Sequence, residues 1–337
     1  MAATQKTIPI TDQPYLCRES LRAQQLWEQC KLQMHPHTRL SLWYIARILL
    51  ISAGTLAAGY WAMGYHWGWC LQPLVLVLLC RSLVALGKHM HDASHRNMSH
   101  NSARQPWVKA LARRLRLSHH HVVNDVLMHG LLAPLLWYDA ALYSKEHQSH
   151  HAWLGTPGKD LELPTIAAQA KKTLWQAMQP FIFSWGWWRS AAIGHLTVMP
   201  LRRLLFTVSW WACLLLALWA LAGHLFVVYV LATVLLTRIG PYHVVRVFLE
   251  LCDHYNMPKA GVLEYTRNMP NNWLGWFLYP DHDNYHIAHH LYPKVPQPRL
   301  KKVHLLLMQV PEYRQAAHFK TYFTGPQAVA KSITGQH

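Results

Sequence analysis

Residues 284–293 read NYHIAHHLYP, and three of these ten residues are histidines. Side chains three and four residues apart share one face of a helix, so His286, His289 and His290 can point toward one place. Neutral imidazole is the commonest metal ligand among side chains. The stretch therefore predicts an incomplete metal site that needs further ligands from elsewhere in the chain.

Two other motifs can supply those ligands. Residues 147–151 read HQSHH and repeat the HxxHH spacing, while residues 91–95 read HDASH, with histidines at i and i+4. With 25 histidines in 337 residues, a given HxxHH triplet is expected by chance only about 0.1 times. Eight imidazoles exceed the coordination of one ion and suit two. An all-imidazole set without a cysteine cluster favours iron over a structural zinc.

The order HxxxH, HxxHH, HxxHH resembles the membrane fatty-acid desaturase and hydroxylase superfamily. So do three neighbouring runs: VND at 123–125, GTP at 155–157 and LYPKVP at 291–296. The resemblance covers residues 43–304. It implies an O₂-dependent oxidoreductase with two iron ions. The implied ligands are His91, His95, His147, His150, His151, His286, His289 and His290, with His254 as a ninth.

Other polar residues near these motifs are expected to orient the ligands. Asp92, Asn284 and Asp253 are candidates, and Asp253 stands where family members often carry Glu before the histidine. Glu250 lies one helical turn before His254. It can reach the metal site, or it can pair with Arg246 one turn earlier.

The remaining histidines are expected to have structural or surface roles. His119, His120 and His121 are consecutive, so on a helix they point in different directions and cannot form one site. Five histidines stand alone, and for each a hydrogen-bonded structural role is expected: His89, His129, His195, His243 and His304.

The composition indicates a membrane protein. Hydrophobic residues make up 52% and charged residues 14% of the chain, against about a quarter charged in soluble proteins. The net charge of +17 is not accompanied by a nucleic-acid recognition motif. Basic residues that flank apolar spans hold them on the cytoplasmic side, which explains the charge without nucleic acid. The six cysteines form no CxxC pair and indicate neither disulfides nor zinc.

The pattern predicts an all-α integral membrane protein with two helical hairpins, each followed by histidines on a cytoplasmic helical cap. A span needs about 20 apolar residues. Turns are expected at 64–68 and Gly223, and a kink at Gly240-Pro241. Residues 128–137 are apolar but only about half a bilayer long. The predicted spans are 43–63, 67–86, 204–222 and 225–239.

We expect a cytoplasmic arm at 1–40 with a solvated helix at 15–34, a membrane desaturase-like domain at 41–310 and a tail at 311–337. Lys and Arg outnumber Asp and Glu by 14 to 6 in residues 88–203, the excess expected of cytoplasmic polypeptide. This places the active site and both termini in the cytoplasm, with the spans in a bacterial inner membrane.

Several functions fit this pattern. The simplest is a desaturase that introduces a double bond into a lipid acyl chain or acyl thioester, and hydroxylation or carotenoid-type ketolation would use the same ligands. A membrane metal transporter or sensor is a non-catalytic alternative. A transporter places its ligands at the bilayer midplane, whereas these motifs lie outside the predicted spans, which favours the enzyme.

An oxidoreductase of this kind needs electrons from another protein. The sequence contains no flavin or haem motif, so an external ferredoxin-like donor is expected. Basic residues can dock such an acidic carrier or bind lipid headgroups: Arg113, Arg114, Arg116, Lys301 and Lys302.

Overall fold

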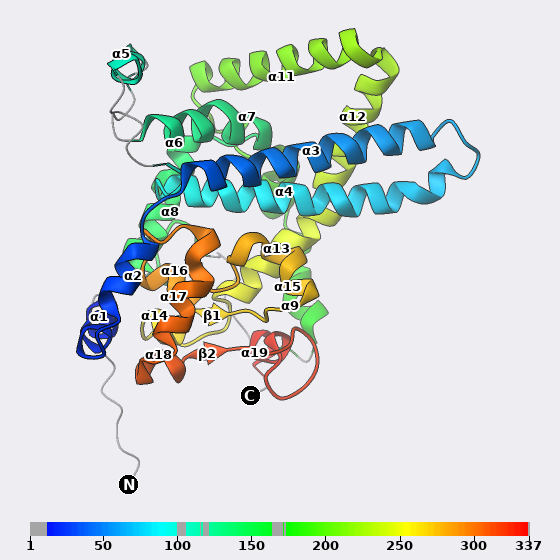
Figure 1. Cartoon of the computed structure of the whole chain (residues 1–337). Coiled ribbons are helices and arrows are strands. Elements are labelled where there is room, and N and C mark those ends of the chain that lie inside the picture. Colours follow the sequence, from blue (N-terminus) through cyan, green and yellow to red (C-terminus); the bar gives the residue numbers. More distant parts are fainter. Residues whose placement is uncertain are drawn as a thin grey trace. The chain divides into compact units, whose positions relative to one another are not determined.

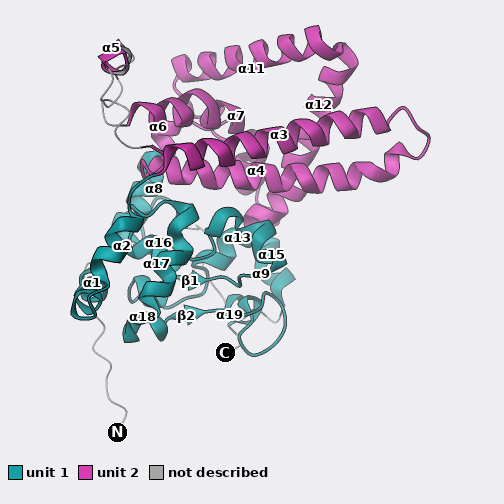
Figure 2. Ribbon diagram, viewed as in Figure 1, with its two compact units in different colours: residues 1–36, 144–180, 248–337 teal, residues 37–143, 181–247 magenta. Residues whose placement is uncertain are grey.

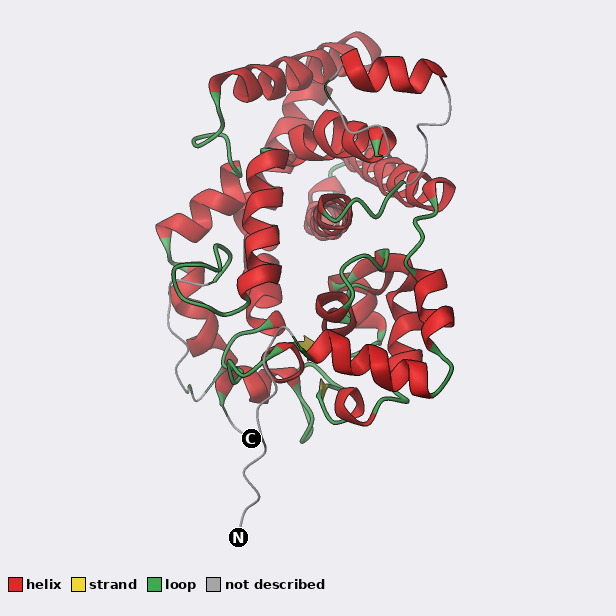
Figure 3. Ribbon diagram, turned by 90° about the vertical axis from the view of Figure 1, so that its left-hand side faces the viewer, coloured by secondary structure: helices red, strands yellow, loops and turns green. Residues whose placement is uncertain are grey.

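A computed structural model of the chain describes residues 12–99, 106–114, 116, 121–163, 171 and 173–335. These residues are mostly helical, with two short strands (Figures 1 and 3). The elements form two compact units, each assembled from separate stretches of sequence (Figure 2). Unit 1 comprises residues 1–36, 144–180 and 248–337, and unit 2 comprises residues 37–143 and 181–247.

Unit 2 holds most of the long apolar helices. Its elements are α3 (Thr38–Ala62), η1 (Gly68–Leu71), α4 (Gln72–Ser94), α5 (Pro106–Arg114), α6 (Val122–Leu127), η3 (Met128–Leu132), α7 (Ala133–Leu136), α10 (Trp185–Ile193), α11 (Leu201–Ala222), α12 (His224–Thr237) and η4 (Arg238–Tyr242). Helices α8 (Ala140–Trp153), α9 (Leu174–Ile182) and α13 (His243–Asp253) each contain a boundary between the units.

Four helical stretches in the described part of the chain are long and apolar enough to cross a membrane. The shortest has 22 residues, and about 20 residues at a rise of 1.5 Å span a hydrocarbon core of roughly 30 Å. The four predicted spans thus correspond to four helical stretches of the structure, which run over Thr38–Ala62, Gly68–Ser94, Leu201–Ala222 and His224–Asp253.

Two of these stretches extend beyond their predicted ends. The second continues from residue 86 to Ser94 and carries His91 on its last turn. The fourth continues to Asp253 through a predicted irregularity. Gly240 has φ −104° and ψ −107°, outside the helical range, and Pro241 follows it in a π-helical turn. Proline removes a backbone donor and clashes with the preceding turn, so the predicted kink at this dipeptide is confirmed.

Polar side chains and glycines join the apolar helices of unit 2. Gln72 donates from Nε2 to the Gly59 carbonyl at 3.2 Å and accepts from the Tyr229 hydroxyl at 2.8 Å. A Cβ on Gly59 would lie 2.2 Å from the Tyr229 hydroxyl oxygen. A Cβ on Gly68 would lie 1.9 Å from the Ala62 carbonyl oxygen, so the turn between α3 and α4 requires glycine there. Small residues and interhelical hydrogen bonds are what holds apolar helices together in lipid.

The apolar segment after the first histidine motif forms a bent pair of helices. Residues Val122–Leu136 and the helix Ala140–Trp153 meet at 98°. Trp137 lies between them in the left-handed region, with φ 63°. The predicted half-bilayer segment at 128–137 therefore ends in a sharp turn, and that turn leads into α8 with the second histidine motif.

Unit 1 is built from shorter elements. They are α1 (Gln13–Ala23), α2 (Trp27–Gln33), α14 (Val262–Tyr265), β1 (Arg267–Asn268), α15 (Trp273–Leu278), η5 (Pro280–His282), α16 (His286–Leu291), η6 (Gln297–Arg299), α17 (Leu300–Leu307), α18 (Pro311–Arg314), β2 (Ala317–His318) and α19 (Val329–Thr334). A continuous hydrophobic cluster joins α1, α2, α14, α16, α17 and α18.

The two terminal segments are integral parts of unit 1. Instead of one solvated helix at 15–34, the structure has two helices that meet at Gln25, whose φ of 60° stops the first one. Leu21 and Cys30 are completely buried in the hydrophobic cluster, which the charged residues around them concealed in the sequence. Beyond residue 311, Tyr313 is also completely buried, and β2 pairs in parallel with β1.

Candidate metal centre

Histidines from three elements of unit 1 converge. The α8 helix carries the second motif, the short α16 helix carries the third, and His254 follows directly on the end of α13. All six residues of α16 are buried, so its three imidazoles point into the protein rather than to solvent. The imidazoles form two groups.

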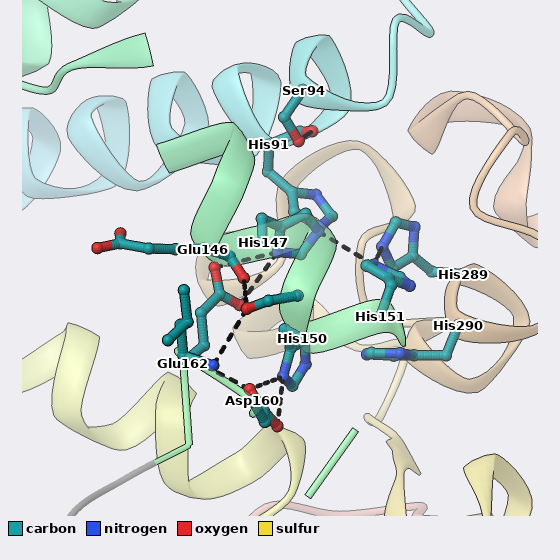
Figure 4. Close-up of polar contacts among 12 residues, drawn as sticks. His91, Ser94, Glu146, His147, His150, His151, Asp160, Glu162, His289 and His290 are labelled. Carbon is teal, nitrogen blue, oxygen red and sulfur yellow. Dashed lines mark hydrogen bonds and ion pairs between the residues drawn. The ribbon is translucent and has the colours of Figure 1, made fainter. Parts of the chain in front are cut away.

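The first group contains His147, His151 and His289 (Figure 4). The Nε2 atom of His151 lies 3.0 Å from His147 Nε2 and 3.0 Å from His289 Nε2. His147 and His151 are one helical turn apart on α8, and His289 comes from α16. The second and third sequence motifs therefore meet at their ring nitrogens.

The second group contains His150, His254, His286 and His290. The Nε2 atom of His254 lies 3.2 Å from that of His150 and 3.2 Å from that of His286. His290 Nε2 lies 3.1 Å from His286 Nε2. This group thus joins α8, α16 and the residue after α13.

The Nδ1 atoms of two α8 histidines, His147 and His150, face carboxylates (Figure 4). His147 Nδ1 lies 3.0 Å from Glu162, and His150 Nδ1 lies 3.1 Å from both carboxylate oxygens of Asp160. An ionised carboxylate can only accept hydrogen bonds, so each Nδ1 donates, and in the neutral imidazole each Nε2 keeps its lone pair. This contact fixes the tautomer and the orientation in which an imidazole binds a metal.

The same reasoning applies to His254. Its Nδ1 donates to the backbone carbonyl of Tyr265 at 3.0 Å, which leaves a lone pair on Nε2. The lone pairs of His254 and His150 therefore face each other across 3.2 Å. Two facing lone pairs repel, and a cation between them, either a proton or a metal ion, makes the arrangement favourable.

Burial and neighbouring charges together determine the pKa of three histidines of this group. Burial lowers the pKa of His254 and of His290 well below the ordinary value, and the neighbouring histidines lower it further. Burial also lowers the pKa of His150, but its hydrogen bond with Asp160 and the nearby carboxylates outweigh burial, so that pKa is raised. Neutral imidazole is the form that binds metal, and metal binding displaces protons.

These residues fit transition-metal ions. Imidazole nitrogens bind such ions at about 2.0–2.1 Å, so nitrogens separated by 3.0–3.2 Å can contact one ion. The nitrogens of His147, His151 and His289 lie within 4.8 Å of one another, as do those of His150, His254 and His290. Imidazole donors supported by carboxylates suit a redox-active ion better than a structural zinc.

The first histidine motif belongs to unit 2. His91 lies on the last turn of α4, and His95 is the residue that caps this helix. Both side chains are buried, and their ring centroids are 5.3 Å apart. The helix therefore presents the two imidazoles side by side, as the i, i+4 spacing predicts.

Three polar residues that were expected to orient ligands hold the surrounding backbone and side chains. Asp253 accepts a hydrogen bond from the Tyr279 hydroxyl at 2.9 Å, and Asn284 donates to a main-chain carbonyl at 3.2 Å. In unit 2, Asp92 accepts from a neighbouring asparagine side chain at 3.0 Å. Each of these residues lies within two positions of a motif histidine or of His254 in the sequence, and its contact restrains the segment that carries that histidine.

Glu250 and Arg246 have different surroundings although they are one turn apart on α13. The charge of Glu250 contributes to raising the pKa of His150 and of Tyr265, so this carboxylate acts on the second histidine group. Arg246 donates to the hydroxyl of Ser190 at 3.3 Å within unit 2.

Sequence reasoning missed the two carboxylates that contact α8. Asp160 is buried, and besides His150 it accepts from the Gly155 backbone N–H at 2.8 Å. Gly155 has φ 71°, and a Cβ there would lie 2.8 Å from the Tyr265 ring. The sequence Gly155-Thr156-Pro157 was a signal for this turn. The chain folds back onto α8 after it, and Asp160 and Glu162 follow within a few residues.

Two of the lone histidines, His195 and His243, make hydrogen bonds to the backbone. His195 accepts from the backbone N–H of Asp139 at 3.3 Å, and burial lowers the pKa of His195 to about 4. His243 donates from Nε2 to a main-chain carbonyl at 2.9 Å. His119 and His120 lie outside the described residues.

Comparison with known proteins agrees with this geometry. The sequence model of the fatty acid desaturase family matches residues 66–322. The human sphingolipid delta(4)-desaturase/C4-monooxygenase DES2 is 28% identical over 312 residues, which cover 90% of this chain and 83% of the human protein. The dihydrorhizobitoxine desaturase of Bradyrhizobium elkanii is 27% identical over 329 residues, which cover 90% of this chain and 85% of that enzyme. The protein is therefore an oxidoreductase with apolar membrane-type helices, and it belongs to the fatty acid desaturase family.

Proposed function

We propose that the protein is an O₂-dependent di-iron oxidoreductase of the membrane that introduces a double bond into the acyl chain of a lipid. The observation that carries this proposal is the convergence of two imidazole groups in unit 1, in which the Nε2 lone pairs of neutral His150 and His254 face each other across 3.2 Å. An unactivated C–H bond is too strong for acid–base chemistry. Bound iron would supply the oxidising power, drawn from O₂, that breaks such a bond.

The ligands of the two ions follow from the grouping. We assign His147, His151 and His289 to one ion. The resemblance implies that His91 and His95 of the first motif are also iron ligands. His150, His254, His286 and His290 would hold the other ion. Eight of these nine are the ligands that the resemblance implies for the three motifs, and His254 joins the second group through Nε2.

The protein itself supplies orientation and exclusion of water. Glu162, Asp160 and the Tyr265 carbonyl hold three imidazoles by their Nδ1 atoms. Fixed tautomers leave every one of these Nε2 lone pairs available to a metal. The burial of α16 keeps bulk water away from its imidazoles, which protects strongly oxidising chemistry from side reactions.

Hydroxylation is the second candidate reaction. It is favoured by the name of the human relative, which couples a delta(4)-desaturase with a C4-monooxygenase activity on sphingolipids. A sphingolipid-type acyl or long-chain base is therefore a substrate class to test beside ordinary acyl lipids. Carotenoid-type ketolation would use the same ligands. The family does not support the transporter or sensor alternative.

The membrane arrangement and the electron donor complete the proposal. Four spans with both termini in the cytoplasm follow from the distribution of Lys and Arg, and reporter fusions at residues 120 and 337 should both read cytoplasmic. Arg113 and Arg114 are exposed on α5 and can dock an acidic ferredoxin-like donor. Charge reversal at both positions should reduce donor-dependent turnover at low salt.

One experiment tests the proposed function directly. The protein, the His290→Ala variant and the His224→Ala control, whose histidine is exposed at the start of α12, are expressed in a host that lacks related enzymes. We expect about two irons per chain in the wild type and the control. Lipid mass spectrometry should show new unsaturated or hydroxylated lipids with these two proteins and none with His290→Ala. One bound zinc and no iron, or unchanged lipids with the wild type, would contradict the proposal.

A further inference from the structure

A strand of only two residues connects the elements that present the second histidine group. Strand β1 consists of Arg267 and Asn268, and both side chains are buried, with 0% and 3% of their surfaces exposed. Neither residue offers an imidazole or a carboxylate. Their side chains nevertheless reach the two backbone segments on either side of the histidines.

Arg267 holds the end of α13. Its Nη1 donates to the carbonyls of Leu251 and Cys252, both at 3.1 Å, and its Nη2 donates to the carbonyl of Tyr255. These three carbonyls bracket His254 in the sequence. The last carbonyls of a helix lack partners within the helix and carry the negative end of its dipole. A buried guanidinium therefore stabilises this end by hydrogen bonds and by charge.

Asn268 holds the start of α16. Its Oδ1 accepts from the backbone N–H of Ile287 at 2.9 Å, and its Nδ2 donates to the Tyr313 hydroxyl at 2.9 Å. Ile287 directly follows His286 and precedes His289 and His290 by two and three residues. The first N–H groups of a helix have no partner within it, so the Asn268 amide fixes where this six-residue helix begins.

The C-terminal segment holds β1 in turn. Arg267 and Asn268 pair with Ala317 and His318 of β2. The Nε of Arg267 donates to the hydroxyl of Ser332 on α19 at 3.0 Å. A second hydrogen bond joins the same two segments: Asn256, two residues after His254, donates from Nδ2 to the main-chain carbonyl of Ile333 at 3.3 Å.

We propose that Arg267 and Asn268 are positioning residues that set His254 and the third histidine motif relative to each other, and that the C-terminal segment 317–334 holds them in place. This inference rests on the proposed function, since it concerns the ligands of the proposed di-iron centre. Displacing the end of α13 or the start of α16 separates nitrogens that now lie 3.2 Å apart. The segment that the sequence presents as a tail thereby supports metal binding without contributing a ligand.

Lysine cannot replace Arg267 in this role. The guanidinium is a planar fork with five donors, and four of its hydrogen bonds here go to acceptors on α13, on the residue after His254 and on α19. An ammonium group has three donors on a single nitrogen, so it cannot reach the acceptors on α13 and the hydroxyl on α19 at the same time. Arg267→Lys therefore keeps the charge and loses part of the positioning, whereas Arg267→Gln loses both.

The test measures iron affinity rather than turnover alone. Iron per chain and its loss to a chelator are measured for the wild type, Arg267→Gln, Arg267→Lys and Asn268→Leu, and thermal unfolding is measured on the metal-free proteins. Arg238→Gln is the matched control. Arg238 is a buried arginine of unit 2, 1% exposed, which donates to the carbonyls of Ala192 and Leu136.

We expect iron affinity to fall about 10- to 100-fold in Arg267→Gln and Asn268→Leu, the usual effect of removing a residue that orients ligands. Arg267→Lys should show a smaller loss. Arg238→Gln should lower thermal stability and leave iron affinity of the folded protein unchanged.

The outcomes separate this inference from the proposed function. If the wild-type protein binds no iron, both the proposed function and this inference are contradicted. Wild-type protein with iron, and equal affinity in Arg267→Gln, Asn268→Leu and Arg238→Gln, overturns the positioning role alone. If Arg267→Gln and Asn268→Leu do not fold, Arg267→Lys compared with Arg238→Lys decides, because both keep a buried cation. Equal iron affinities in that pair also overturn the positioning role.

Discussion

Helix α16 of unit 1 and helix α11 of unit 2 differ in how far the protein buries their side chains. In unit 1 every residue of α16 is buried, although three of its six residues are histidines. In unit 2 the helix Leu201–Ala222 is strongly apolar, yet only 6% of an 18-residue apolar stretch within it is buried in the protein. Apolar surface left outside a protein indicates an apolar solvent, and buried polar groups are stable only when they are paired or bind ions. The surface of α11 is thus suited to lipid, and the surroundings of α16 are suited to metal.

The largest expected effect comes from removing a buried imidazole of unit 1. His150→Ala should abolish activity and lower iron affinity by at least about 100-fold, beyond the range typical of residues that only orient ligands. Membrane insertion should persist, because His150 lies outside the four long apolar helices. Iron analysis of the membrane fraction checks this result. Loss of the protein from the membrane would mean that the histidines stabilise the whole fold.

A matched pair of leucines tests the difference in solvent. Leu216 on α11 and Leu305 on α17 are both 58% exposed. An arginine near the middle of a membrane helix costs about 2.5–3.5 kcal/mol, whereas an exposed substitution facing water usually changes stability by less than about 0.5 kcal/mol. Leu216→Arg should therefore sharply reduce membrane insertion, and Leu305→Arg should leave insertion and iron content unchanged. Equal effects would remove the distinction between the two surroundings.

Local patterns explain what the sequence could predict. The lengths of the apolar segments predicted four helical stretches, and Gly240-Pro241 predicted the break in the fourth. These two features could be predicted because they depend on residues within one or two helical turns of each other. The HxxHH spacing predicted that the three histidines of each motif would point toward one place. The structure instead divides each triplet between the two groups: His150 lies apart from His147 and His151, and His289 lies apart from His286 and His290.

The parts that could not be predicted depend on contacts between distant residues. Asp160 and Glu162 reach α8 only because the chain turns back at Gly155. Arg267 reaches the end of α13 and the hydroxyl of Ser332, which lies 65 residues further along the chain. No periodicity in the sequence encodes such pairs. The sequence therefore predicted a tail after residue 311, whereas Tyr313 and strand β2 pack inside unit 1.

The two carboxylates on α8 should differ in effect because they differ in burial. The Asp160 side chain is completely buried, whereas 28% of the Glu162 side chain is exposed. Asp160→Asn should lower iron affinity about 10- to 100-fold. Glu162→Gln should have a smaller effect, because water can replace an exposed hydrogen-bond partner. Chelator competition with purified protein ranks the two variants, and a larger loss in Glu162→Gln would contradict the role assigned to burial.

The smallest and sharpest comparison lies within one helix. Arg246 and Glu250 are one turn apart on α13, and the boundary between the units falls between them. An i, i+4 ion pair on a helix surface is worth only about 0.2–0.5 kcal/mol, and removing either partner of such a pair should have equal, small effects on stability. The structure gives the two side chains different surroundings: Arg246 donates to Ser190 in unit 2, while the charge of Glu250 acts on His150 in unit 1.

Glu250→Gln, which keeps the shape and removes the charge, should therefore reduce iron affinity and activity, and Arg246→Gln should reduce them less. Equal, small losses of stability with unchanged iron would make Glu250 a structural ion-pair partner. A loss of iron confined to Glu250→Gln would assign Glu250 to the metal centre of unit 1.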